Sequence, residues 1–552
     1  MRANPGKLAL ALIASAALLA PIPSYPSALQ PAPEEDPVLQ AMEAELERSK
    51  SQLKLEGVPS PYYVDYRVFD IDGLTAQAAY GALRTNFRAR IRFARVVVRV
   101  GDYKQDSFWG QGQGLAELMP VDDDNLALRH QLWLLTDQAY KASTEALTAK
   151  QAQLKQYNVE QPVDDFARAE PLRFIGPLAK LDEDAAPWLR LLQGSSALYR
   201  TDPEIQFAQS SLDFHVVNRY YVNSEGASVR SGQALYQISF SANTQAADGM
   251  ALERSFAFTL SDWRQLPSPP DFLSRTRELL ASLKELRAAP IAEEEYRGPV
   301  LFSSDAASRV FADLVGENVL GLKPELGQSA RTRGEYASSL KARVLPAFLS
   351  MVDDPRLTSF SGKPLIGHYD VDDEGVKAIR VEVIQNGTLV TYLIGRTPIR
   401  DIPASNGHGR AGLPANFPGP SLGNMIVSSS EPVPKEELKK RLMDLCRQRD
   451  LPYGYFVEAM GGLSEPRLLY RVWVKDGHEE LVRGATFADL DTRALRNNLV
   501  AAGDDVNVEN QAQNIPHSIA NPSILFDELE VKRRDNKNLK LPEYPPPPGE
   551  AH

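Results

Sequence analysis

The alternation of hydrophobic and polar residues divides the first half of the chain into helices and strands. Apolar residues recur at helical spacing over Asp36–Leu53, and a longer helical pattern covers Asp122–Gln156. Between them, Tyr62–Gly73 and Arg88–Tyr103 alternate as strands do. Ser210–Gln245 repeats this alternation on both sides of the turn-forming stretch NSEG. This half is therefore expected to be a mixed α/β domain.

The pattern changes near residue 290. A helical stretch, Asp271–Pro290, ends at a proline, and the linker-like segment AAPIAEEEY follows. Strands and turns then dominate, with hairpins predicted at Asn386-Gly387 and Asp476-Gly477. The Gly- and Pro-rich segment Ser405–Gly423 is expected to have no regular structure.

These patterns predict an α+β fold of two domains. The predicted parts are an N-terminal α/β domain at 36–290, a β-rich C-terminal domain at 296–532, and a Pro-rich tail at 533–552.

The N-terminus is typical of an export signal. Arg2 and Lys7 precede the 13-residue apolar run Leu8–Ala20, which is short for a membrane span. We expect residues 1–28 to be a secretory signal peptide, with cleavage between Ala20 and Gln30; the alternative is a buried helix. No other stretch is apolar enough to cross a bilayer, so the mature chain is expected to be periplasmic or secreted.

The composition excludes several classes of function and of site. The 72 acidic residues outnumber the 61 basic ones, which argues against nucleic-acid binding as the main role. Cys446 is the single cysteine, so neither an intrachain disulfide nor a Cys-rich zinc site can form. Cys446 lies in an amphipathic helical pattern and is expected to be a small buried residue.

Local catalytic motifs are weak. No two of the seven histidines are three to five residues apart, and His478, which begins HEELVR, lacks the second histidine of a zincin motif. GPSLG around Ser421 matches the G-x-S-x-G elbow, but a strand-like segment follows it where that elbow needs a helix. SSLK (Ser338 to Lys341) fits S-x-x-K without the accompanying motifs of penicillin-recognising enzymes.

Two charged segments have structural interpretations. DVDDEG (Asp370 to Gly375) lacks the glutamate that closes a calcium loop, so a tight acidic turn before a strand is expected. Several arginines lie at strand spacing, and a solvated strand face accounts for them. They are Arg84, Arg88, Arg90, Arg92, Arg95 and Arg99.

Several stretches together resemble the TldD/PmbA (TldD/TldE) family of metallopeptidase-related proteins. They include VDDEGVKAIRVEVIQNGTLVTYLIGR, SNGHGRAG, LGNMIVSSS and ELVRGATF, while LPAFLSMVDDPRL, AAGDD and PSILFDELE resemble the larger, signal-bearing branch. The resemblance implies a two-domain subunit that pairs around a shared cavity. In TldD-type subunits, it implies a zinc site made of HExxxH and a cysteine further on, with the glutamate as general base.

Aligned on this motif, ADLVGENVLG (Ala312 to Gly321) is the helix end that would carry HExxxH. Gly316 and Gly321 stand at the two histidine positions, and only the glutamate remains, as Glu317. No cysteine occurs in Tyr453–Gly462, where the third ligand is expected. We therefore expect no metal and no cofactor in this chain, with zinc only in a partner subunit.

The resulting hypothesis is a zinc-free PmbA/TldE-like subunit, not catalytic on its own, in a complex that processes small or unfolded peptides. It would form a homodimer or a heterodimer with an HExxxH-bearing TldD-like subunit. Candidate peptide-binding residues lie in the glycine-rich loop: Asn406, Gly407, His408 and Arg410. One alternative is a stand-alone homodimeric envelope scaffold; another is a hydrolase that uses His408, Glu317 or Ser421.

Overall fold

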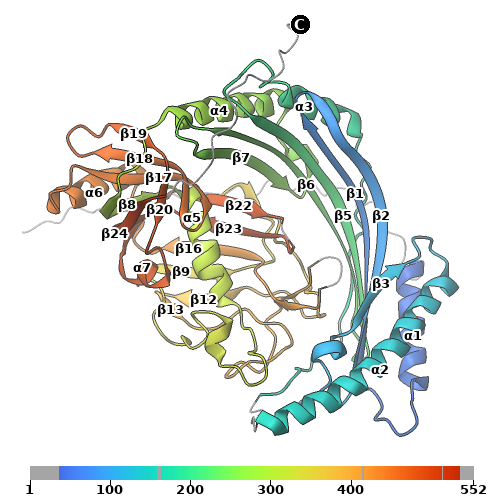
Figure 1. Ribbon diagram of the computed structural model, residues 1–552. Coiled ribbons are helices and arrows are strands. Elements are labelled where there is room, and N and C mark those ends of the chain that lie inside the picture. The colour runs from blue at the N-terminus through green and yellow to red at the C-terminus, as the bar shows by residue number, and fades with distance from the viewer. Residues whose placement is uncertain (1–35, 158–162, 413–415, 513, 535–552) are drawn as a thin grey trace, which may run out of the picture. The chain divides into compact units, whose positions relative to one another are not determined.

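The computed structural model describes residues 36–157, 163–412, 416–512 and 514–534. Helices account for 26% of the residues and strands for 38% (Figure 1). This mixture of sheets and helices confirms the predicted α+β class. The predicted signal peptide and the Pro-rich tail beyond residue 534 lie outside the described residues. No helix in the described part of the chain combines the length and hydrophobicity that a membrane span requires.

A seven-stranded sheet forms the framework of the first half (Figure 1). Its order is β3-β2-β1-β5-β6-β4, and β7 pairs with β6. The strands are β1 Tyr63–Ala79, β2 Ala82–Arg99, β3 Leu115–Met119, β4 Arg173–Ile175, β5 Phe207–Asn223, β6 Ser228–Gln245 and β7 Ala251–Leu260. β1 and β2 are longer than predicted, because Leu74–Phe87 belongs to their hairpin, which turns at Tyr80-Gly81 with positive φ at both residues.

Two helix pairs cover one face of this sheet. α1 and α2 pack on Val64, Tyr66 and Val68 of β1, and α3 and α4 share a core with Leu74 and Ala76 of the same strand. Because side chains alternate along a strand, these residues define one face of β1. The helices are α1 Pro37–Gln52, α2 Asn125–Tyr157, α3 Ala185–Ser196 and α4 Pro269–Ala288. Three of them match the predicted helices; the sequence analysis missed α3.

The second half contains two larger sheets around one hydrophobic core. One has the order β19-β18-β17-β8-β24-β20 with β21 on β24, and the other has the order β13-β12-β9-β16-β23-β22. The first comprises β8 Glu295–Phe302, β17 Tyr453–Gly462, β18 Glu465–Trp473, β19 Glu479–Val482, β20 Ala485–Phe487, β21 Leu499–Ala502 and β24 Ile524–Arg533. The second comprises β9 Leu349–Asp353, β12 Val381–Gln385, β13 Thr388–Leu389, β16 Asn424–Ser429, β22 Asn507–Gln511 and β23 His517–Asn521.

Three helices and two short strand pairs complete this half. They are α5 Ser304–Phe311, α6 Lys435–Gln448, α7 Thr492–Asn497, β10 Ser359–Phe360 with β11 Lys363–Pro364, and β14 Gly409–Arg410 with β15 Gly419–Pro420. Both predicted hairpins form, as β12–β13 and β18–β19. The expectation of no regular structure in Ser405–Gly423 was wrong at one point, because β14 pairs with β15 there.

The arginines of β2 also correct the sequence analysis. Arg92, Arg95 and Arg99 are buried, with 1%, 5% and 3% of their surface exposed, so they do not form a solvated face. Arg92 contacts Asp70 at 2.6 Å and Asp123 at 2.8 Å, and Arg99 contacts Asp106 at 2.6 Å. The strand pattern could not reveal this, because the counter-charges come from other segments.

Candidate functional site

The segment that aligns with the family's zinc motif is the end of a short helix. Ser303 caps α5 by accepting a hydrogen bond from the N–H of Ala306, and the helix continues as a wide π turn, Ala312–Gly316, and a tight 3₁₀ turn, Glu317–Val319. Leu320 is already extended, and Gly321 donates its N–H to the carbonyl of Leu393 at 2.8 Å. Glu317 is exposed at this end. The predicted helix end is confirmed, but its two glycines lie in different backbone structures.

Packing closes both positions at which the family motif has histidines. A Cβ built on Gly316 would lie 3.0 Å from Cδ1 of Leu422 and 3.7 Å from Sδ of Met425. A Cβ on Gly321 would lie 3.1 Å from both Cδ1 of Ile399 and the carbonyl oxygen of Leu393. Since a Cβ alone is tightly confined at both positions, an imidazole would require the neighbouring side chains to move.

The single cysteine, Cys446, is not placed to bind zinc either. Cys446 is fully buried in α6, and its sulfur packs over Gly454 of β17. Burial raises the pKa of the Cys446 thiol to about 11, whereas a zinc ligand must be a thiolate. Within the described residues, no three His, Cys, Asp or Glu side chains are grouped to hold a metal. The residues present at this site therefore do not fit a catalytic zinc ion.

One histidine that the sequence analysis did not single out lies near Glu317. His517 begins β23, and its Nδ1 is 2.9 Å from the carbonyl oxygen of Ile515. Burial lowers the pKa of His517, although the nearby charges of Asp353 and Glu317 act in the opposite direction. The sequence gives no sign of this proximity, because 200 positions separate His517 from Glu317.

The glycine-rich loop is held by internal hydrogen bonds. His408 is fully buried; its Nδ1 lies 3.0 Å from the carbonyl of Asn406, and its Nε2 lies 3.2 Å from Oδ1 of Asp353. The Asn406 amide bonds the backbone of Tyr392 and Ile394 at 2.8 and 2.9 Å. Both ring nitrogens of His408 are therefore engaged, and the ring is closed to solvent.

The other two candidates in this loop are equally enclosed. The carbonyl of Gly407 accepts from the Tyr369 hydroxyl at 2.9 Å, and the Arg410 guanidinium lies 4.1 Å above the Tyr369 ring. Arg410 Nε also bonds Asp373 at 3.0 Å. The loop thus locks several strands together, and its backbone faces protein.

The acidic turn ahead of this loop has the form predicted for DVDDEG. Asp372 accepts the N–H groups of Glu374 and Val376, at 3.0 and 2.8 Å, and that of Gly409 at 2.9 Å. Burial, together with the neighbouring Glu374 carboxylate, raises the pKa of Asp372 to about 7. Burial opposes ionisation of Asp373 as well, but Arg410 and Arg219 hold its pKa below the usual range. The two adjacent carboxyls of this turn thus have pKa values shifted in opposite directions, that of Asp372 upward and that of Asp373 downward.

A cavity of about 770 Å³ opens beside Gly321. Apolar side chains such as Leu320, Leu340 and Ile399 line it, and charged residues stand among them. The charged lining residues are Lys323, Glu325, Arg333, Arg400 and Asp401. This volume falls within the range of small-molecule and cofactor sites.

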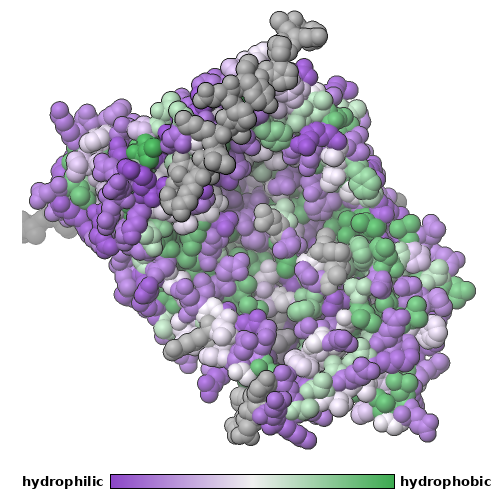
Figure 2. Space-filling view, viewed as in Figure 1, coloured by the Kyte–Doolittle hydropathy of each residue, from purple (hydrophilic) through white to green (hydrophobic). Residues whose placement is uncertain are grey.

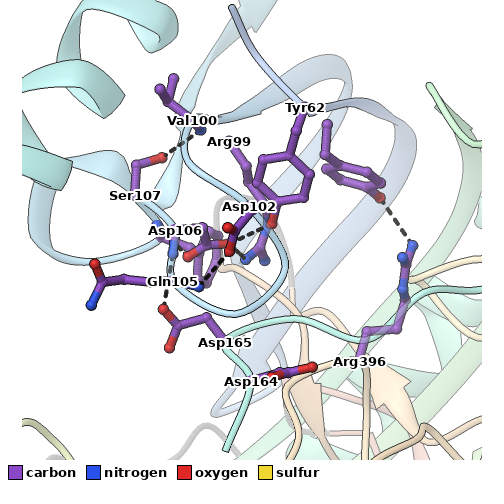
Figure 3. Close-up of polar contacts among 12 residues, drawn as sticks. Tyr62, Arg99, Val100, Asp102, Gln105, Asp106, Ser107, Asp164, Asp165 and Arg396 are labelled. Atoms are coloured by element: carbon purple, nitrogen blue, oxygen red, sulfur yellow. Dashed lines mark hydrogen bonds and ion pairs between the residues drawn. The ribbon is translucent and has the colours of Figure 1, made fainter. Parts of the chain in front are cut away.

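Lys323 ties one wall of the cavity to the first half of the chain. Its ammonium lies 2.8 Å from Asp165, which also binds Lys150 of α2 at 2.5 Å. Asp165 in turn accepts the N–H of Asp106 at 3.0 Å, and Asp106 binds Arg99 (Figure 3). A chain of charged residues, buried except at Lys323, thus connects the cavity wall to β2.

The remaining motifs do not assemble into a catalytic pair. Ser338 lines the cavity, but Ser338 to Lys341 lies in turns where S-x-x-K needs a helix. The N–H of Ser421 donates to the carbonyl of His408 at 3.0 Å, while the His408 ring bonds Asn406 and Asp353. No helix follows Ser421, because β16 begins at Asn424.

Comparisons with known proteins find similar sequences and similar structures. Residues 295–533 match the model of the PmbA/TldA metallopeptidase C-terminal domain. The chain is 25% identical over 267 residues to the metalloprotease PmbA homolog of Haemophilus influenzae; this alignment covers 47% of the chain and 54% of that protein, about half its length.

Solved structures share the fold over most of the chain. A Thermotoga maritima protein described as a candidate modulator of DNA gyrase matches with a TM-score of 0.60 and 14% identity, covering 89% of this chain and 99% of that one. TldE from Thermococcus kodakarensis matches with a TM-score of 0.56 and 11% identity, with the same coverage. Residues 295–533 are thus a C-terminal domain of the PmbA/TldD metallopeptidase-related family, and the structural matches show that the fold of these proteins extends over most of the chain.

Proposed function

We propose that the chain is an exported, zinc-free subunit of a TldD/PmbA-type peptide-processing assembly. The observation that carries this proposal is the packing at Gly316 and Gly321, where Leu422 and Ile399 occupy the space that histidine side chains need. The hydrolytic zinc then belongs to an HExxxH-bearing partner, and this chain contributes binding surface. Export rests on the N-terminal signal pattern.

The cavity beside Gly321 is the surface that we assign to peptide. Its wall from Leu322 to Gln328 has no helix or strand, so its backbone groups can bond an extended chain. Apolar side chains at the centre and charged ones among them suit peptides of mixed sequence. The loop Asn406–Arg410 supports this region from within and is not assigned to peptide contact.

Zinc and partner content test the subunit role. The purified mature chain should contain less than about 0.1 zinc per chain by elemental mass spectrometry and should not cleave unfolded peptide libraries. Native capture from envelope extract should recover an HExxxH-bearing relative. Stoichiometric zinc, with hydrolysis that Glu317→Gln abolishes, would disprove the role; capture of the chain only with itself would favour the scaffold alternative.

Peptide binding is tested at the cavity. Ala337→Trp adds an indole to the lining and should weaken binding of an unfolded peptide at least about tenfold in fluorescence anisotropy, because it removes volume. Ala404→Trp places the same side chain at an exposed position outside the lining and should leave binding unchanged. Equal effects of both substitutions would remove the cavity from the proposal.

A further inference from the structure

A closed turn places two charged residues on the wall of the cavity beside Gly321. Ile399 and Ile402 exchange both backbone hydrogen bonds, at 3.2 and 3.1 Å, so Arg400 and Asp401 form the tip of the turn between them. Both tip residues line the cavity, and both are exposed. Asp401 has a φ of +69°, a left-handed conformation that few residues other than glycine, asparagine and aspartate adopt. The turn thus presents one positive and one negative side chain from consecutive residues.

The other charged residues of the lining are already paired. Lys323 donates to the carboxylate of Asp165 at 2.8 Å and to the carbonyl of Asp164 at 3.0 Å. Arg333 donates to the carboxylate of Glu325 at 3.2 Å. These contacts neutralise each charge within the protein, so a ligand need not compensate for them.

The two charges at the tip of the turn are unpaired. Among the described residues, the side chains of Arg400 and Asp401 form no hydrogen bond and no ion pair, either with each other or with a neighbour. Water can solvate both charges in the empty cavity, but a ligand that fills the cavity displaces this water. Such a ligand must then supply a negative group for Arg400 and a positive group for Asp401.

The rest of the lining is largely apolar. Its apolar members are Leu320, Leu322, Leu340, Tyr392, Pro398 and Ile399. The molecular surface has a different character, since hydrophilic residues cover most of the face shown in Figure 2. An apolar lining accepts side chains of many kinds, and charged contacts strengthen beside it once water is excluded.

Short peptides with free ends carry the two charges that the turn lacks. Near neutral pH the α-carboxyl group, with a pKa of about 3.3–3.7, is ionised, and the α-amino group, with a pKa of about 7.7–8.0, is largely protonated. The interior of a long chain offers only neutral amides to the same turn. A guanidinium also binds a carboxylate through two parallel hydrogen bonds, which favours Arg400 as the partner of the carboxylate.

The spacing of the two charges limits the length of the peptide. Consecutive Cα atoms lie about 3.8 Å apart, whereas two or three extended residues span about 7–11 Å. Both ends of a peptide can therefore reach Arg400 and Asp401 together only if the peptide is very short. The cavity volume of about 770 Å³ leaves room for the side chains of such a peptide.

We infer that this cavity binds di- and tripeptides through their free ends, with Arg400 holding the α-carboxylate and Asp401 the α-ammonium group. The inference rests on the proposed function, because it names the peptides that the assigned surface takes. Free amino acids carry the same two charges, so the test includes leucine beside trileucine.

Calorimetric titration of the purified mature chain tests both contacts. Trileucine with free ends should bind, and amidation of its carboxylate or acetylation of its amine should each raise the Kd at least about tenfold, because one enclosed charge loses its partner. Arg400→Gln should abolish the preference for the acid over the amide. Asp401→Asn should abolish the preference for the free over the acetylated amine, and asparagine tolerates the positive φ of the turn.

Arg343→Gln is the matched control. Arg343 is exposed, lies outside the lining, and its side chain has no partner among the described residues. This variant should keep the wild-type Kd for all three forms of trileucine. A loss of end preference in Arg343→Gln equal to that in Arg400→Gln would overturn the assignment to the turn.

The remaining outcomes separate this inference from the proposed function. Equal Kd values for free-ended and blocked trileucine would overturn the inference but keep the cavity as a peptide surface. An end preference that survives both Arg400→Gln and Asp401→Asn would show that other residues hold the ends. Tighter binding of leucine than of trileucine would assign the site to amino acids instead of peptides. If neither trileucine nor an unfolded peptide bound, the cavity would be removed from the proposed function as well.

Discussion

The two halves of β2 carry the same kind of residue in opposite environments. Arg92, Arg95 and Arg99 are buried by segments that follow the strand, whereas Arg84, Arg88 and Arg90 are exposed on the half of β2 that β3 does not cover, 82–91. Arg99 has the rings of Phe108 and Phe166 at 3.9 and 3.8 Å from its guanidinium and the carboxylate of Asp106 at 2.6 Å. Arginines at strand spacing are thus exposed to solvent only where no other segment packs over them and supplies a carboxylate.

The largest loss of unfolding free energy is expected at the buried end of β2, beside Arg99. Asp106→Ala leaves Arg99 buried without its carboxylate and removes the acceptor of the Tyr62 hydroxyl at 2.7 Å. Removing one partner of a buried ion pair typically costs about 3–5 kcal/mol, because the remaining charge stays desolvated. The free energy of unfolding, from urea titration followed by circular dichroism, should fall by that amount. A loss below about 1 kcal/mol would mean that Arg99 reaches water and that the two halves do not differ.

A smaller, pH-dependent effect is expected where the halves meet. Asp70 accepts from Arg90, which is half exposed, and from Arg92, which is buried. Burial alone would raise its pKa, but the hydrogen bonds from the two arginines hold the pKa of Asp70 below the usual range. A carboxyl with a lowered folded-state pKa stabilises the protein above the unfolded-state pKa of about 3.9, and this stabilisation is lost as the pH falls below it.

Asp70→Asn removes this contribution. At pH 7 the variant should lose about 1–3 kcal/mol of unfolding free energy, because the carboxylate that accepts from the two guanidinium groups becomes a neutral amide. The difference from the wild type should shrink as the pH falls from about 5 to about 2, which urea titrations across that range would measure. A difference independent of pH would instead attribute the loss to packing.

Much of the fold could be predicted from sequence because it depends on local signals. The helical spacing of apolar residues predicted α1, α2 and α4, and the turn pairs Asn386-Gly387 and Asp476-Gly477 predicted two hairpins. Both signals span only a few residues, and each predicted element formed. α3 was missed, and so was the short pair β14–β15, because its paired residues lie nine and eleven positions apart across a Gly- and Pro-rich segment.

For the candidate site, the sequence could predict only that the zinc ligands of the family motif are missing. The residues at positions 316, 317 and 321 could be read from the sequence, since they belong to one helix end. The packing of Leu422 and Ile399 over the two glycines, and the approach of His517 to Glu317, join segments about 80 to 200 positions apart. Such contacts depend on the tertiary fold, and no spacing rule applies to them.

The smallest loss of unfolding free energy is expected on the exposed half of β2. It gives the most direct comparison with the buried half. Arg88 and Asp72 form a bidentate pair at 2.9 and 3.3 Å, and half of the Arg88 side chain is exposed. Because water can solvate whichever charge remains, Asp72→Ala should cost only about 0–1 kcal/mol, and 0.5 M salt should reduce even that. Urea titration of Asp72→Ala beside Asp106→Ala makes this comparison. If the two losses were equal, burial would not be what separates the two halves of β2, and contact geometry alone would set the stability of these arginines.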